Sequence, residues 1–534
     1  MLFRSERVQR DALQAGLPDD NTPLRDSGSR ATAYAVAVRV YLAFAVDRVA
    51  DFGNSLCGWS SSNQKVMHLF GKQSLPMVWD FSEANVLADV VGGFMPATDF
   101  IAECILKLPQ HGFGRASQQD AMSSQIACGK VVSTDPPYYD NVPYADLSDF
   151  FYVWLRRSLK PIFPDLFATL AVPKAEELVA FPYRHAGKAG AEAFFLDGMT
   201  QAMHRLAEQA HTSFPVTIYY AFKQSESDSD EGTTNTGWDT FLAAVIEAGF
   251  AISGTWPMRS EQEYRMRGMG SNALASSIIL VCRPRSASAP TATRRDFLTA
   301  LKAELPTALA HLQRGNIAPV DLAQAVIGPG MAVYTRNAKV LNAEGQPLSV
   351  REALALINQT LDEALAEQEG DFDADSRWAL TWFEQSGFAE GEYGVAEQLS
   401  KSKNTSVTGM VEAGILLSAR GKVRLLRPEE LPADWDPATD PRLTAWEMVH
   451  HLIRVLEVGG EGAAAEIVAK LGAKAEVARE LCYRLYTLCE RKKRAPEALA
   501  YNGLVQSWPE ISRLAREGGK PSPEQASLFG EIEE

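Results

Sequence analysis

The residues best suited to chemistry stand together where an apolar stretch beginning at Val131 runs into Asp135-Pro136-Pro137-Tyr138. The two prolines make this loop rigid, because proline fixes φ and has no N–H to donate. An amino group on a nucleic-acid base is a poor nucleophile, since its lone pair is delocalised into the ring. A site that alkylates it must therefore accept hydrogen bonds from both amino protons. Asp135 can supply one acceptor and the carbonyl of Pro136 the other, while Tyr138 can stack on a base extruded from the duplex.

This tetrapeptide resembles the catalytic motif of methyltransferases that act on exocyclic amino groups of nucleic-acid bases. A simple turn is the alternative, since Asp and Pro are common turn formers, but four specified residues directly after an apolar stretch favour the catalytic interpretation. No strong general base is required, because the amine becomes acidic only as the methyl group arrives and can lose its proton to Asp135 or to water. We expect three nearby side chains to shape the base pocket: Tyr139, Asn141 and Tyr144.

Strands and helices alternate around this motif, which predicts an α/β fold with a doubly wound, parallel sheet. Strands are predicted at 114–121, 129–135, 216–222, 250–256 and 276–282, the last of them antiparallel, and helices at 100–108, 147–159, 191–213 and 240–248. The first two strands end in Asp120 and Asp135, and a parallel sheet would place these acids side by side over a ligand crevice. A helix N-cap is the alternative role for Asp120.

The pattern along the chain predicts six segments. A helical upstream segment covers 1–72 and contains an apolar helix, 31–52, that we expect to be buried. The catalytic core follows over 73–285 and ends at a linker-like stretch, 284–295. The remaining predictions are a helical connector (286–370) with a turn at 327–331, a winged-helix or plain helical subdomain (371–430) containing a two-stranded ribbon, a helical domain (431–520) and a mobile tail (521–534).

Composition excludes several classes of protein. The chain has 534 residues, 46% hydrophobic and 22% charged, as in ordinary globular proteins, and its net charge of −15 argues against non-specific coating of nucleic acid. A local basic site remains open, and Arg156 and Arg157 follow the motif closely enough to contact phosphates. Six cysteines without a Cys-x-x-Cys pair indicate neither a disulfide framework nor a metal site. We expect a cytoplasmic protein without a membrane partner, since no apolar run is long enough to span a bilayer.

At family level, residues 135–157 resemble the large bacterial and archaeal adenine-specific DNA methylases that carry a zinc-ribbon insertion. Residues 76–85 and 327–331 resemble further segments of that family. The resemblance implies a Rossmann-like methyltransferase that uses S-adenosylmethionine to modify adenine in DNA, often within a phage-defence or modification locus. It also implies DNA and other defence-locus proteins as partners.

The chain departs from that family in its cofactor-binding parts. Family members hold the methionine end of the cofactor with a glycine-rich loop after the first strand, and neither this loop nor the zinc-ribbon cysteines are found. Asp120 is the one acid that we carry over, as a contact to the adenine end. We therefore expect the C-terminal part of a longer enzyme, either a gene fragment or one subunit of a split protein that pairs with the missing upstream segment. Two alternatives are a non-catalytic nucleic-acid-binding or assembly protein and an RNA amino-methyltransferase.

Overall fold

The computed structural model describes residues 5–71, 74–75, 77–108, 114–140, 142–220, 236–259, 276–432 and 434–517. By its internal contacts the chain divides into two compact units. Unit 1 comprises Met1–Ser124 and Pro137–Met199, and unit 2 comprises Gln125–Pro136 and Thr200–Glu534. Among the described residues, no helix has the length and apolar character needed to cross a membrane.

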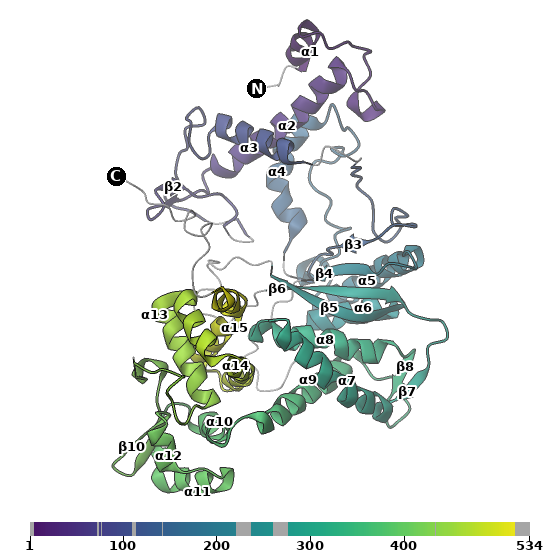
Figure 1. Cartoon of the computed structure of the whole chain (residues 1–534). Helices are drawn as coiled ribbons and strands as arrows, with labels where there is room; N and C mark the ends of the chain where they lie inside the picture. The colour runs from purple at the N-terminus through teal and green to yellow at the C-terminus, as the bar shows by residue number, and fades with distance from the viewer. Residues whose placement is uncertain are drawn as a thin grey trace. The chain divides into compact units, whose positions relative to one another are not determined.

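The described part of unit 1 contains four complete helices and the first part of α5 (Lys188–Gln209), with short 3-10 turns at Leu24–Asp26 and Pro182–Arg184 and a small hairpin of β1 (Trp59–Ser60) and β2 (Lys65–Val66). The four complete helices are α1 (Ser5–Gln14), α2 (Ala31–Phe52), α3 (Phe94–Lys107) and α4 (Tyr144–Leu159) (Figure 1). Helix α2 contacts the other three. Its residue Ala43 packs with Leu159, Ile162 and Phe167 in a common core.

The predicted helix 31–52 is confirmed, but the expectation that it is buried is wrong for its large side chains. Only alanines of α2 are buried, whereas Tyr34 is 52% exposed and Phe44 is 40% exposed. The neighbouring helices cover the faces that carry small side chains, because small residues let helix axes approach closely. An apolar pattern all round a helix therefore does not by itself show that every face of the helix is buried.

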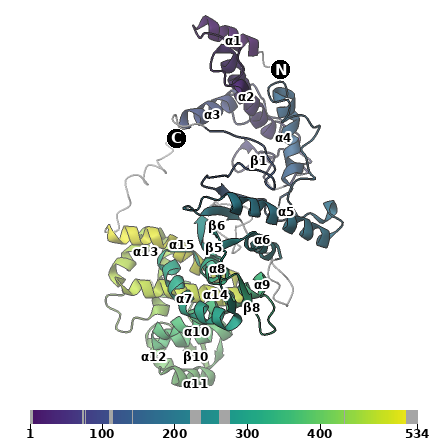
Figure 2. The ribbon, with the colours of Figure 1, turned by 90° about the vertical axis from the view of Figure 1, so that its right-hand side faces the viewer.

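Unit 2 begins with a four-stranded sheet in the order β3-β4-β6-β5. Its strands are β3 (Ser133–Thr134), β4 (Val216–Tyr220), β5 (Phe250–Arg259) and β6 (Ser276–Pro284). β3 pairs parallel with β4, and β6 pairs antiparallel with both β4 and β5, so three strands run in one direction and β6 runs against them. The antiparallel direction predicted for 276–282 is confirmed. Helices α6 (Thr236–Glu247) and α8 (Pro319–Thr335) pack on β5 (Figure 2).

The strand predicted at 114–121 does not form. Residues 114–120 have no regular secondary structure, and every one of them is exposed. Most of these residues are polar and none is β-branched, so they lack the apolar face that a strand buries against a sheet. Asp120 therefore does not stand at the end of a strand. The described residues do not contain the two neighbouring strands that were expected to bring Asp120 beside Asp135.

Three helices follow the sheet and pack against it or each other: α7 (Arg294–Arg314), α8 and α9 (Val350–Glu367). A parallel pair of short strands, β7 (Thr291–Thr293) and β8 (Lys339–Leu341), ties this region together. The turn predicted at 327–331 is wrong, because these residues lie inside α8, with Pro329 within the helix. Gly328 lies against Thr255 of β5 and Gly330 against Ile357 of α9, so both glycines serve close packing rather than a change of direction.

Replacing Gly328 should be costly. A Cβ at this position would overlap the backbone nitrogen of Thr255, which cannot move without breaking the sheet. We expect Gly328→Ala to lower the free energy of unfolding by about 2–3 kcal/mol, as overpacking of a tight core does. Gly503→Ala in α15 (Ala495–Arg516) is the matched control, since a Cβ there meets nothing within 4 Å, and it should raise stability by about 0.5–1 kcal/mol. Urea unfolding of the two variants measures the difference, and equal midpoints would contradict the packing role of Gly328.

The C-terminal part of unit 2 contains a winged-helix-like module and a helical bundle. The module runs through α10 (Ala374–Ser386), β9 (Gly391–Glu392), α11 (Tyr393–Lys403), α12 (Val407–Glu412), β10 (Leu416–Ala419) and β11 (Lys422–Leu425). Its strands form an antiparallel sheet in the order β10-β11-β9, which includes the expected two-stranded ribbon. The bundle consists of α13 (Ala445–Leu471), α14 (Lys474–Arg491) and α15 (Ala495–Arg516) (Figure 1). The predicted tail 521–534 lies outside the described residues.

Candidate functional site

The strand that leads into the candidate motif is held through β4. The backbone N–H of Thr217 donates to the carbonyl of Val132 at 3.1 Å, and the Thr217 hydroxyl lies 3.0 Å from the hydroxyl of Ser133. Asp135 follows directly at the carboxyl end of β3 and is exposed, whereas Pro136 is buried. The carboxylate therefore stands at the sheet edge where ligands of α/β proteins bind, and a buried proline fixes the backbone behind it.

The candidate tetrapeptide is also one of the places where the chain passes between its units. Asp135 and Pro136 belong to unit 2, whereas Pro137 and Tyr138 belong to unit 1. Tyr138 is partly exposed, as a side chain that offers one face to a ligand must be. The proposed roles of these residues rest on their being consecutive in the chain.

In unit 1 the loop after the motif is fixed by Tyr139. This residue has a φ of 38°, in the left-handed region that a bulky residue rarely adopts. Its carbonyl accepts the N–H of Ala180 at 2.9 Å, and its ring meets the fully buried ring of Phe195 edge-on at 5.1 Å. Burial raises the pKa of Tyr139 to about 12, so the side chain stays a neutral phenol. Strain of this kind persists only where surrounding contacts hold it, and it gathers at functional loops.

An ion network fixes the start of α4, which leaves this loop. Glu177 accepts the backbone N–H of Ala145 at 2.9 Å, and the Arg184 guanidinium binds Glu177 and Asp146 at 2.6 Å each. The hydroxyl of Tyr183 donates to Asp146 at 3.0 Å. Sequence reasoning did not identify Glu177 or Arg184, and the only local signal is their position in a stretch rich in aromatic and basic residues.

The other predicted substrate contacts are spread along α4. Tyr144 is the first residue of the helix and is exposed, while Arg156 and Arg157 lie in its last turn. Arg156 follows Tyr144 by twelve positions along the helix, which corresponds to about 18 Å along the axis. Arg156 donates to the carbonyl of Thr169 at 2.8 Å. A phosphate bound by these arginines would therefore lie several nucleotides away from a base held at the start of α4. Asn141 lies outside the described residues.

Asp120, the acid carried over for the cofactor, stabilises a turn. Its carboxylate accepts the N–H of Met122 at 3.0 Å and the hydroxyl of Ser123 at 2.9 Å. This is the local capping geometry that Asp commonly adopts in loops. The glycine-rich loop expected of the family has no counterpart among the described strand ends upstream of Asp135. The described residues therefore do not fit the methionine and ribose ends of S-adenosylmethionine.

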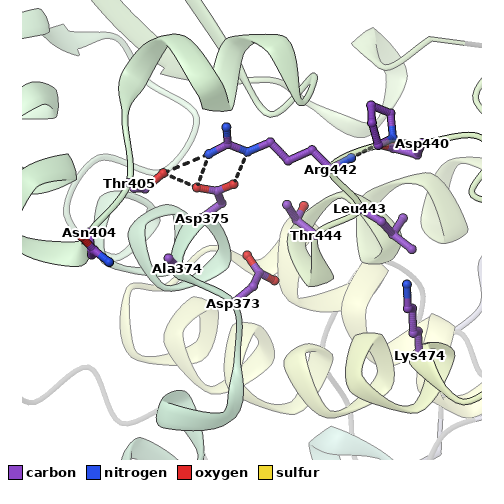
Figure 3. Close-up of a pocket in the computed structure, with 11 residues that line it drawn as sticks. Asp373, Ala374, Asp375, Asn404, Thr405, Asp440, Arg442, Leu443, Thr444 and Lys474 are labelled. Atoms are coloured by element: carbon purple, nitrogen blue, oxygen red, sulfur yellow. Dashed lines mark hydrogen bonds and ion pairs between the residues drawn. The ribbon is translucent and has the colours of Figure 1, made fainter.

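A polar cavity of about 380 Å³ lies in unit 2, where the winged-helix-like module meets the first turns of α13 and α14. Figure 3 shows the guanidinium of Arg442 against the carboxylate of Asp375 and the hydroxyl of Thr405. Arg442 Nε lies 2.8 Å from Asp375, whose side chain is 8% exposed. Asp373 accepts the N–H of Ala445 at 2.9 Å. These acids join the module to the bundle, so the cavity lies at a structural junction.

Beside this junction Glu447 is buried in α13, one helical turn before the buried His451. Glu447 is 4% exposed, and burial, followed by the neighbouring Asp440, raises its pKa to about 8. His451 stacks on Trp435 with ring centroids 4.1 Å apart, and burial lowers its pKa to about 4. At neutral pH this cluster therefore favours a protonated acid and a neutral imidazole.

The stability of the folded chain should depend on pH through the ionisation of Glu447. Because its pKa is raised in the folded chain, its contribution is full below about pH 4.5 and is lost as the pH rises through 8. Glu447→Gln stays neutral, so its advantage over the unsubstituted chain should grow from pH 5 to pH 9, to on the order of 3 kcal/mol. Urea unfolding across this range measures the effect. Parallel pH profiles would show that Glu447 is ionised in the folded state.

A comparison with known protein families gives a match for part of the chain. Residues 373–528 match the family model described as a domain of unknown function, DUF8807, which covers the winged-helix-like module and the bundle. No curated protein and no solved structure matches the chain. The matched residues do not include the candidate motif or the four-stranded sheet.

Proposed function

We propose that the chain is the base-binding and catalytic part of an S-adenosylmethionine-dependent methyltransferase that acts on the exocyclic amino group of adenine in DNA. The observation that carries the proposal is the position of Asp135. An Asp-Pro-Pro-Tyr sequence begins with an exposed acid at the carboxyl end of a strand that is paired in parallel with its neighbour. This combination of motif and strand end is what amino-group methylation requires.

Each residue of the motif has a role that follows from its chemistry. The carboxylate of Asp135 accepts a hydrogen bond from one amino proton of the base, and the carbonyl of Pro136 accepts the other. Accepting both protons draws the nitrogen lone pair out of the ring and towards tetrahedral geometry. The ring of Tyr138 stacks on the base once it has left the duplex, and such stacking contributes about 1–3 kcal/mol per base. The methyl group is supplied by the cofactor.

The sheet supports a Rossmann-like assignment as part of the same proposal. Strands β3, β4 and β5 run in one direction, and the polypeptide crosses from β3 to β4 through helices α4 and α5 (Lys188–Gln209). Crossovers of this kind build doubly wound sheets, in which ligands bind outside the carboxyl ends of the strands. We place the base at this end of β3.

One observation favours a second candidate, a non-catalytic assembly or nucleic-acid-binding component. The described residues do not form the expected cofactor site, because Asp120 is engaged in a turn and residues 114–120 form no strand. A chain that keeps the motif without a cofactor site of its own could serve assembly alone.

Transfer of tritium from methyl-labelled S-adenosylmethionine separates these candidates. The chain is purified after co-expression with the reading frames that neighbour its gene and is incubated with duplex DNA or with RNA of the same sequence. We expect label in DNA that contains adenine and none in DNA built without adenine. Label in RNA alone would move the substrate class to RNA, and no label in either would favour the assembly role.

A further inference from the structure

The winged-helix-like module contains a helix-turn-helix. α11 ends at Lys403, three residues form the turn, and α12 begins at Val407 and contacts β10. Val407 and Met410 are buried, whereas Thr408 and Val411 are exposed. Helix α12 therefore buries one face in the module and presents the other to solvent. In DNA-binding proteins of this architecture, the second helix enters the major groove.

The hairpin of β10 and β11 carries an arginine at its tip. Two residues, Arg420 and Gly421, form its turn, and both have a positive φ, 51° and 76°. Turns of this kind favour Asn-Gly, because asparagine and glycine tolerate the left-handed region and a long side chain rarely adopts it. The carbonyl of Gly421 accepts the N–H of Tyr393 at 2.9 Å, which fixes the tip to α11. Backbone strain that is held by such contacts gathers at functional positions.

Positive charge is concentrated around these two elements. Residues 401–427 include six basic residues and one acid, although the chain as a whole carries a net charge of −15. Arg420 is exposed and has no hydrogen-bond or ion-pair partner among the described residues. The ion pairs of Lys401 and Lys422 are exposed and therefore weak, so phosphate groups can displace their acids. Arg424 differs, because two hydrogen bonds to one carboxylate hold it in the fold. A local cluster of this sign fits a polyanion.

The shape of this surface favours B-form DNA over other nucleic acids. The major groove of B-DNA, about 12 Å wide, admits a helix, and its minor groove, about 6 Å wide, admits an arginine side chain. The major groove of duplex RNA is too deep and narrow to be read in this way. A single strand would be held by exposed aromatic side chains, and α12, β10 and β11 contain no aromatic residue.

We propose that the winged-helix-like module binds duplex DNA, with α12 in the major groove and the side chain of Arg420 in the neighbouring minor groove. Lys401 and Lys422 contact the flanking phosphates. This inference rests on the proposed function in taking DNA as the substrate, and it adds a binding surface remote from Asp135 in the sequence. The module supplies affinity for the duplex, while the loop at Asp135 acts on one base.

Fluorescence anisotropy of the full-length chain with a short labelled DNA duplex tests the hairpin tip. Arg420→Asn removes the charge but keeps a residue that tolerates a positive φ, so the turn is preserved. Lys493→Asn is the matched control, because Lys493 is also exposed, has a φ of 54° and lies outside the module. We expect Arg420→Asn to weaken binding about tenfold and to lower the slope of log affinity against log salt concentration by about one. Lys493→Asn should bind as the unsubstituted chain does.

Thr408→Glu tests α12 in the same assay. Thr408 is exposed, so the substitution leaves the fold intact but sets a carboxylate against the duplex, and it should weaken binding about tenfold or more. The unsubstituted chain should bind the DNA duplex about tenfold or more tightly than duplex RNA or single-stranded DNA of the same sequence. Urea unfolding checks that each variant is folded.

Four results would overturn the proposal: no binding of the duplex by the unsubstituted chain, equal affinity of Arg420→Asn and Lys493→Asn, unimpaired binding by Thr408→Glu, or equal binding of the three nucleic acids. Binding that depends on Arg420 without methyl transfer would defeat the proposed function only. Methylation of DNA by a chain whose binding is independent of Arg420 would defeat this inference only.

Discussion

Asp135→Ala in the complete enzyme should lower the rate of methyl transfer by about 100- to 1,000-fold, the usual effect of removing one preorganised hydrogen-bonding group from a transition state. The carboxylate is the acceptor that draws the amino nitrogen out of conjugation, and water cannot replace it at fixed geometry. Because Asp135 is exposed, its removal should change the free energy of unfolding by no more than about 0.5 kcal/mol. Single-turnover transfer to an adenine-containing duplex measures the rate.

Asp140→Ala is the matched control for that measurement. It removes an exposed acid from the same loop, so it changes the local charge equally without touching the motif. We expect its transfer rate to stay within a factor of about three of the unsubstituted enzyme. Tyr138→Ala should fall between the two, since loss of one stacked ring corresponds to roughly a 10- to 100-fold effect. Unsubstituted rates in Asp135→Ala would show that this acid has no catalytic role.

The second large effect concerns the cofactor. The chain alone should bind S-adenosylmethionine with a dissociation constant above about 1 mM, which is about 4 kcal/mol weaker than micromolar binding by a complete cofactor site. Half a site cannot offset the desolvation and ordering that binding requires. Asp120 is engaged with Met122 and Ser123 and would have to leave its turn to contact a ligand.

Isothermal calorimetry on the purified chain measures this constant. A micromolar dissociation constant for the chain without a partner would contradict this expectation. It would mean that the first 110 residues build a cofactor loop of another kind.

The helices could be predicted from sequence because their signals are local and long. The helix at 31–52 was predicted with the bounds that the structure gives, since a long, mainly apolar segment without Gly or Pro admits few alternatives. The turn predicted at 327–331 was wrong because tertiary packing decides the structure of this segment. Glycine and proline usually break helices, but in α8 the glycines fit the backbone of β5 and the side chain of Ile357. Only the packed structure shows that close approach.

The candidate site could be predicted from the sequence only where its residues are adjacent in the chain. Asp135 to Tyr138 are adjacent, so their chemistry can be inferred without a fold. Glu177 and Arg184 could not be inferred, because they reach the start of α4 through contacts across more than 30 residues. The same holds for Asp375 and Arg442, which lie 67 residues apart. Charged residues that stabilise a fold through such pairs carry no periodic signal in the sequence.

The central claim, that this chain methylates adenine in DNA, is tested most directly by mass spectrometry of DNA nucleosides. DNA is taken from cells that express the chain with the reading frames that neighbour its gene, and from matched cells that express Asp135→Ala with the same reading frames. The proposed function predicts N6-methyladenine in the first sample and the background level of the host in the second. Equal amounts of methylated adenine in the two samples, or none above background in either, would contradict it.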